Sequence, residues 1–322
     1  MKDSHWSVQK EKAAGYWQLA FTLILFKLLP VVFLKIIAFP VGFFYFLFSA
    51  KAREYSRTYL QRLTLYAGVK KTSSLRHITA FSIAIVEKLE AWGGKAAFKK
   101  IHFNTDVNGN IIDDDIAELA QRLEDGKGAM LISSHLGNME FIRGLAGLNR
   151  TGISREVPVN AIVDFRVTAH FNRMLNRLNP NSHMSLINAG DLGPETIVLL
   201  QERLAAGELV VIAGDRTSAN QDSRLLPLPF LNAEAPFPYG PYFLAAILGV
   251  PVYAVFAMRQ KDLSISSHYD MRIHKCPVSF DCPRQQRQSR IEELAVWFIS
   301  LLEKYCKIYP HQWYNFFDFW HP

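Results

Sequence analysis

The sequence predicts an α/β fold, in which a central, mostly parallel sheet is flanked by helices and a hydrophobic helical membrane anchor precedes it. Two observations predict this fold. Short apolar runs typical of buried strands alternate with helical stretches from about residue 64 onward, and a long, almost uncharged segment comes before them. The expected strands are residues 129–134, 159–163, 209–213 and 252–257, and the stretches 169–178 and 195–206 are examples of the expected helices.

Strands that alternate with helices indicate a largely parallel sheet with both faces covered. The chain has 322 residues, which is enough for one large α/β domain or for one domain with an extension. We expect two regions: a membrane-associating segment at residues 1–63 and a catalytic domain at residues 64–322.

The anchor is predicted from residues 16–50, where Lys27 and Lys35 are the only charged side chains. Each uncharged stretch is shorter than the roughly 18–20 residues of a simple spanning helix. Pro30 and Pro40 each disfavour a helix interior. Two hypotheses therefore stay open: one spanning helix whose lysine reaches an interface, or two shorter helices that lie in one leaflet. A pair of buried core helices is less favoured, because the segment is apolar on all sides.

Charge and composition limit the partners. Hydrophobic residues make up 49% of the chain and the formal net charge is +7. A basic surface favours acidic lipid head groups, nucleic acid or an acidic carrier protein, but no recognisable nucleic-acid module is present, so we expect no nucleic-acid partner. The basic residues that follow the apolar segment place the rest of the chain in the cytoplasm by the positive-inside tendency. These are Lys51, Arg53, Arg57 and Arg62.

No motif indicates a cofactor or a metal ion. The three cysteines, Cys276, Cys282 and Cys306, form no CxxC pair, which argues against a zinc site and against a disulfide framework. The sequence also contains no convincing phosphate-binding loop or dinucleotide motif.

The sharpest chemical signal is the run SSHLGNME at residues 133–140. It follows a predicted strand, and ligands of parallel sheets bind beyond the carboxyl ends of the strands. His135 is therefore placed to act as a general base. Glu140, in the first turn of the next helix, can reach back to the imidazole, fix its tautomer and stabilise its charged form. By itself this spacing fits equally well a strand-end histidine with an unrelated glutamate nearby.

Two further strand ends carry polar residues. Arg166, just after residues 159–163, can hold a phosphate or polarise a carbonyl, or can be a surface arginine. Asp215 and Arg216, just after residues 209–213, can orient a substrate, or can form a structural ion pair.

Together these segments resemble a known family. HLGNME resembles the HX4(D/E) motif of the lysophospholipid acyltransferase superfamily. The order of the other elements resembles its lipid A late acyltransferase branch over nearly the whole chain: the hydrophobic N-terminus, the strand-end arginine, the acid after LVVIAG, the PFLNA…PFPYGP run and the QWY near the end. The ending QWYNFFDFW is more similar to predicted members associated with aryl polyene or other glycolipid pathways.

The resemblance implies a glycerolipid acyltransferase-like fold and an enzyme at the cytoplasmic face of the bacterial inner membrane. Such an enzyme moves a fatty acyl group from an acyl-carrier-protein thioester to a hydroxyl or amine of a membrane lipid or glycolipid. The resemblance implies that His135 is the base and Glu140 its acid partner. It also implies that Arg166 lies near the reacting centre and that Asp215 is the acid of the third block.

One departure bears on the acceptor. The lipid A enzymes usually carry Asp-Gln where this chain has Asp215-Arg216, and the Gly-Asp-Arg-Thr run is closer to the Glu-Gly-Thr-Arg block of glycerolipid acyltransferases. The alternative is thus a glycerolipid acyltransferase that uses acyl-CoA or carrier-bound acyl groups. A second alternative, a non-catalytic lipid-binding membrane protein, is disfavoured because a binding module needs neither His135 nor Glu140.

Overall fold

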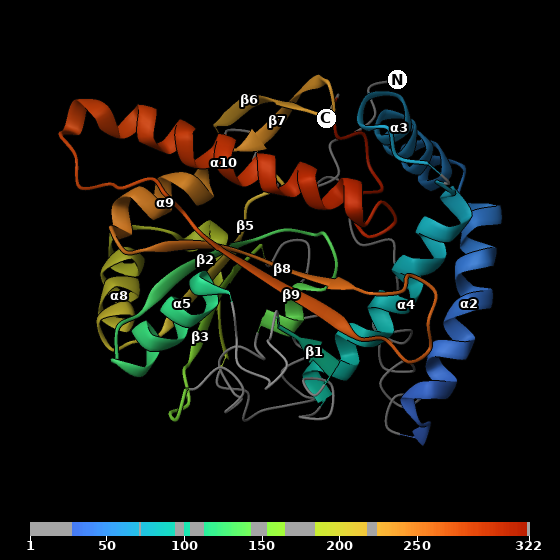
Figure 1. The fold of residues 1–322 in the computed structure, drawn as a ribbon, viewed down its shortest axis with the longest axis horizontal. Coiled ribbons are helices and arrows are strands. Elements are labelled where there is room, and N and C mark those ends of the chain that lie inside the picture. Colours follow the sequence, from blue (N-terminus) through green and yellow to red (C-terminus); the bar gives the residue numbers. More distant parts are fainter. Residues whose placement is uncertain are drawn as a thin grey trace.

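The computed structural model describes residues 28–70, 72–93, 100–103, 113–142, 153–164, 184–217 and 224–320. Within them a seven-stranded sheet, in the order β1-β9-β8-β2-β5-β3-β4, forms the centre of the molecule (Figure 1). Its neighbouring strands pair in parallel, except for the antiparallel pair β8–β9. The predicted α/β fold with a mostly parallel sheet is confirmed.

The strands of this sheet are β1 (Ile101–His102), β2 (Ala129–Ser133), β3 (Val159–Val163), β4 (Met184–Asn188), β5 (Leu209–Ala213), β8 (Val252–Arg259) and β9 (Tyr269–Lys275). A separate hairpin consists of β6 (Leu225–Phe230) and β7 (Ala233–Pro238). The four strands predicted from sequence are β2, β3, β5 and β8, which are neighbours in the sheet. They were the recognisable ones because their residues are almost all buried, which requires continuous apolar runs.

The helices are α2 (Val31–Phe48), α3 (Ala50–Ala67), α4 (Ser74–Gly93), α5 (Asp114–Glu124), α8 (Pro194–Ala205), α9 (Gly240–Leu248) and α10 (Arg287–Ile308). The helix expected at residues 195–206 is α8. The helix expected at residues 169–178 lies outside the described residues. Figure 1 shows α2 and α4 side by side at one end of the molecule, with α10 running across the sheet.

The apolar segment differs from expectation at Pro40. Helix α2 continues through this residue, while Pro30 forms the N-cap of the helix. Pro40 lies on the exposed side, so the backbone hydrogen bond that it cannot make disturbs no packed face. By length and composition α2 can cross a membrane, with a mean hydropathy of 2.3. Residues 16–27 of the segment lie outside the described residues, so both hypotheses, one spanning helix or two shorter helices, stay predictions.

Lys35 does not reach an interface. It is buried on the face of α2 that packs against α4, and its Nζ lies 3.0 Å from Glu87 Oε1 and 2.8 Å from Glu90 Oε2. A buried lysine needs such partners, because an unpaired ammonium in an apolar interior is costly. The anchor helix is thereby joined to the rest of the protein by ion pairs as well as by apolar contacts.

Helix α3 also packs into the main core. Tyr59, Leu60 and Leu63 are buried there together with residues of β2, β5 and α10, and the Tyr59 ring lies 5.0 Å from that of Trp313. Helix α3, which runs past the predicted boundary at residue 63, therefore shares the hydrophobic core of the sheet.

Candidate active site

The turn after β2 presents His135 at the carboxyl edge of the sheet. The backbone N–H of Gly137 donates to Gln312 O and that of Asn138 to Ala257 O, both at 2.9 Å. Gly137 has φ +75°, and a Cβ at this position would lie 2.0 Å from Ala257 O. Glycine is required here, because the backbone is left-handed and lies directly against β8. This explains the glycine two residues after the histidine.

Asp215 comes to the same place from the neighbouring strand. The N–H of Gly214 donates to Ser133 O at 2.8 Å, which continues the pairing of β2 with β5 past the strand ends. His135 Nδ1 then lies 2.8 Å from Asp215 Oδ1, and the backbone N–H of His135 donates to Asp215 Oδ2 at 2.8 Å. The Asp215 side chain is fully buried. Asp215 therefore orients both the ring and the backbone of His135.

This geometry sets the chemistry of the imidazole. Nδ1–H donates to the carboxylate, so the lone pair of the neutral ring is on Nε2, where it can accept a proton. The tautomer is assigned from these hydrogen bonds. Burial lowers the pKa of His135, and the positive charges of Arg216 and Lys88 lower it further, whereas Asp215 raises it. The imidazole is thus held in its neutral, basic form, with Asp215 ready to stabilise the imidazolium.

Burial raises the pKa of Asp215, but the charges of His135 and Arg216 and the hydrogen bonds from His135 outweigh it, so the pKa lies below its ordinary range. The carboxylate is therefore ionised at neutral pH. The sequence hypothesis gave the role of orienting the imidazole to Glu140. In the structure the contact with Nδ1 is made by Asp215, 80 residues further along the chain.

Glu140 lies in a 3₁₀ turn, η2 (Met139–Ile142), and residues 143–152 after it lie outside the described residues. Its Oε1 is 3.2 Å from Nζ of Lys88, on α4. The sequence did not single out Lys88, since one lysine in an amphipathic helix is ordinarily a solvated surface residue. The structure thus places Glu140 beside a cation contributed by the helix that packs on α2.

A comparison with models of protein families shows the family of this chain. The model described as bacterial lipid A biosynthesis acyltransferase matches residues 1–321. The chain belongs to this family. A comparison with curated proteins finds no match. The protein is therefore an acyltransferase of the lipid A biosynthesis type, and the resemblance seen in its sequence is confirmed.

Arg216 of this acyltransferase lies next to the histidine–aspartate pair. It donates from Nη2 to Tyr314 O, and its Cζ lies 5.6 Å from the centre of the Phe317 ring. Its Nε is buried and has no hydrogen-bond partner among the described residues. Burial lowers the pKa of Arg216 to about 10, so the guanidinium remains charged at neutral pH. Arg166, the other predicted substrate-binding arginine, lies outside the described residues.

The QWY segment near the C-terminus contacts the residues of the candidate site. Trp313 is fully buried, and its Nε1–H donates to Asp215 Oδ2 at 3.0 Å. The backbone of Gln312 accepts from Gly137, and the N–H of Tyr314 donates to His135 O at 3.2 Å. The sequence showed this motif but not its role, which only the contact with Asp215 reveals.

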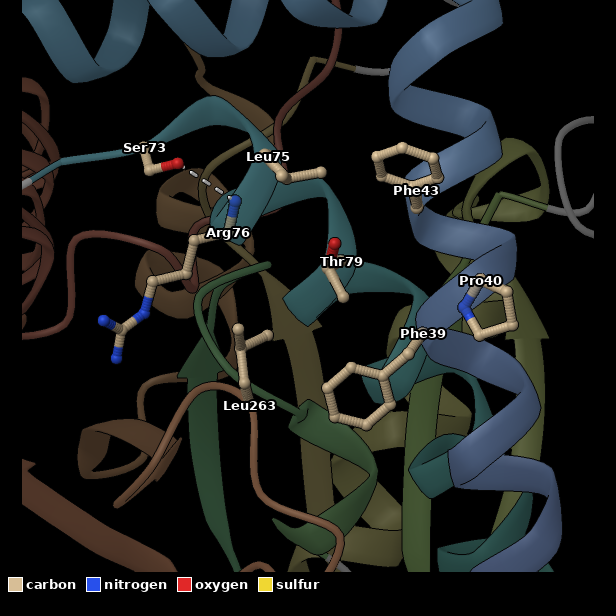
Figure 2. Close-up of a pocket in the computed structure, with 8 residues that line it drawn as sticks. All are labelled: Phe39, Pro40, Phe43, Ser73, Leu75, Arg76, Thr79 and Leu263. Carbon is tan, nitrogen blue, oxygen red and sulfur yellow. Dashed lines mark hydrogen bonds between the residues drawn. The ribbon is translucent and has the colours of Figure 1, made fainter.

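An apolar pocket of about 430 Å³ lies between α2, α4 and the turn joining β8 to β9 (Figure 2). The rings of Phe39 and Phe43 line one side, and the Arg76 guanidinium points away from them. The remaining lining residues are Pro40, Ser73, Leu75, Thr79 and Leu263. None of the predicted site residues is among them, so this pocket does not contain the candidate catalytic centre.

Proposed function

We propose that this acyltransferase moves a fatty acyl group from an acyl-carrier-protein thioester to a hydroxyl or amine of a membrane lipid or glycolipid, with His135 as the general base. The observation that carries the proposal is the buried Asp215 bonded to Nδ1 of His135, which leaves Nε2 for the substrate. A carboxylate that orients a neutral histidine is the arrangement used to activate hydroxyl nucleophiles in acyl transfer.

In the proposed reaction, Nε2 takes the proton of the acceptor as its oxygen or nitrogen attacks the thioester carbonyl. A tetrahedral intermediate forms, and its oxyanion is stabilised by hydrogen-bond donors or a positive charge. Arg216 supports this role, because its charged group has a buried Nε with no protein acceptor among the described residues; Arg166 is the second candidate. When the intermediate collapses, the C–S bond breaks and the leaving thiolate takes the proton from the imidazolium.

Glu140, the carboxylate of the HX4E motif, is proposed to take part in acyl transfer as a second acidic residue besides Asp215, and it lies beside Lys88. The alternative acceptor class, a glycerolipid taking its acyl group from acyl-CoA or carrier protein, is favoured by the Gly214-Asp215-Arg216-Thr217 run. A non-catalytic lipid-binding protein does not require the His135–Asp215 pair, which has the geometry of a catalytic base.

Membrane attachment is proposed to occur through α2, with the catalytic residues on the cytoplasmic side of the inner membrane. Family membership supports association with a membrane. The face of α2 turned away from α4 is apolar and exposed, and the positive residues of α3 follow it directly, as expected near anionic head groups. The large exposed residues of α2 are Val32, Phe33, Ile36, Ile37, Val41, Phe43, Phe44, Tyr45, Leu47 and Phe48.

Lipid mass spectrometry of the source bacterium, with and without the gene, is the direct test of function. Loss of one acyl chain from a glycolipid or lipid A-type species is the expected result. An unchanged glycolipid profile together with altered phospholipid acylation would replace this proposal by the glycerolipid alternative.

Deletion of residues 1–50 is expected to remove the acyltransferase from membranes and to leave it aggregated. The deletion removes the exposed apolar face of α2, and it also uncovers α4 and takes Lys35 away from Glu87 and Glu90. Flotation of membranes in a density gradient, followed by gel filtration, measures both effects. Full-length protein recovered in the soluble fraction without detergent would contradict the proposed anchor.

Activity with carrier-bound acyl groups is expected to fall as salt rises. The chain has a formal charge of +7 and acyl carrier proteins are acidic, so docking depends on electrostatic attraction, which salt screens. The Debye length shrinks from about 10 Å at 0.1 M salt to about 3 Å at 1 M. Initial rates with acyl-carrier protein and with acyl-CoA, measured in the same salt series, provide the comparison. A preference for acyl-CoA that salt does not change would support the glycerolipid alternative.

A further inference from the structure

One turn of α4 has ion-pair partners on two sides. Glu87 and Glu90 receive Lys35 from α2. Glu87 also lies 3.1 Å from Arg259 Nε on β8, and Ser267 and Tyr269 donate their hydroxyls to it. Lys35, Glu87 and Arg259 are almost completely inaccessible to solvent. Because each charge in this cluster is paired or hydrogen-bonded, the turn is held in a fixed position between the anchor helix and the sheet.

Lys88, in the same turn, is directed to the catalytic motif. Its Nζ is 3.2 Å from Glu140 Oε1, and Glu140 is 11% exposed where Lys88 is 33% exposed. Burying a carboxylate is costly unless a cationic or hydrogen-bonding partner compensates it. Asn138 supports the backbone of the same residue, since its Oδ1 accepts from the N–H of Glu140 at 3.2 Å. Lys88 is thus a partner that comes from a rigid element outside the HX4E loop.

We propose that Lys88 is a positioning residue for Glu140, and that the turn of α4 held by the ion pairs with Lys35 and Arg259 fixes the position of this carboxylate. The inference rests on the proposed function, in which Glu140 takes part in acyl transfer. The inference goes beyond the HX4E motif, because Lys88 lies more than forty positions before His135. It also explains why the anchor helix carries a buried lysine: Lys35 stabilises the turn from which Lys88 extends.

The test uses the full-length enzyme purified in detergent, with Lys88→Met, Lys88→Arg, Glu140→Gln and the double variant Lys88→Met/Glu140→Gln. We expect Lys88→Met to lower kcat by about 10²-fold, as a misplaced catalytic group does, with a smaller change in KM for the donor. Lys88→Arg should restore most of kcat. The double variant should be scarcely worse than the poorer single variant, because residues that act as a unit are not additive.

Lys275→Met is the matched control. It removes an exposed lysine that forms a similar ion pair with Glu118, 2.6 Å away on α5, and it should leave kcat unchanged. Thermal melting of every variant separates loss of positioning from loss of folding.

The pH–rate profile gives a readout that a purely structural lysine would not move. Among the described residues, the charged groups that act on His135 are Arg216, Asp215 and Lys88. The positive charge of Lys88 lowers the pKa of the imidazole. Lys88→Met should therefore move the acidic limb of the profile to higher pH, while Lys88→Arg should leave it in place.

Two results would overturn the inference, and they are distinguishable. If Glu140→Gln is inactive while Lys88→Met keeps the parent kcat and pH profile, Lys88 does not position Glu140 and the proposed function stands. If Glu140→Gln is itself fully active, Glu140 leaves the proposed mechanism and Lys88 has no carboxylate to position.

Discussion

His135→Ala is expected to lower the rate of acyl transfer by about 10²–10⁴-fold, the usual contribution of a general base. The loss should appear in kcat, because the variant removes the proton acceptor rather than a binding contact. Folding should be preserved, since the His135 side chain is 28% exposed and Asp215 keeps its bonds from the His135 backbone and from Trp313.

The measurement is the initial rate with one donor and one acceptor lipid, at matched thermal stability. His102→Ala, which removes an exposed histidine on edge strand β1, serves as the control and should retain full activity. A His135→Ala enzyme that works at the parent rate would show that the assigned mechanism is wrong.

Asp215→Asn is expected to lower kcat on the order of 10⁴-fold, the effect of the same exchange in a serine-protease triad. Among the described residues, this carboxylate accepts hydrogen bonds from three donors: His135 Nδ1–H, the His135 backbone N–H and Trp313 Nε1–H. The asparagine oxygen would replace Oδ2, which accepts two of these bonds, and the NH₂ would then face Nδ1, from which it cannot accept. The imidazole would then adopt the other tautomer, in which Nε2 carries a proton and cannot act as the base, and no charge would balance the imidazolium.

Glu140→Gln, measured beside Asp215→Asn, separates the two carboxylates. If Asp215 orients the imidazole, Asp215→Asn should be the more damaging, and its double variant with His135→Ala should be scarcely worse than His135→Ala alone. Denaturant unfolding of each variant shows whether lost activity reflects a lower free energy of unfolding. Parent-level activity of a stably folded Asp215→Asn enzyme would assign Asp215 a structural role.

The sequence by itself determined the fold class, the four central strands and the place of His135, the proposed base, at a strand end. Each of these depends on local pattern. A strand buried on both faces must be apolar throughout, as in β2 and β5, and a ligand-binding histidine is found where such a strand ends. The HX4E motif and the QWY segment were also readable, because their residues are adjacent in the chain.

Only the tertiary structure decided which groups these residues contact. Asp215 reaches His135 because β2 and β5 are parallel neighbours in register, so their carboxyl ends meet although the residues are 80 positions apart. Spacing along the chain predicts Glu140, five positions from His135, as the partner of the imidazole. In the structure Glu140 forms an ion pair with Lys88 on α4. In the sequence, Lys35 is a charge that a spanning helix would have to place at the membrane–water interface. In the structure it is buried and paired with Glu87 and Glu90 of α4. Partners of this kind are fixed by strand order and helix packing, which spacing along the chain does not encode.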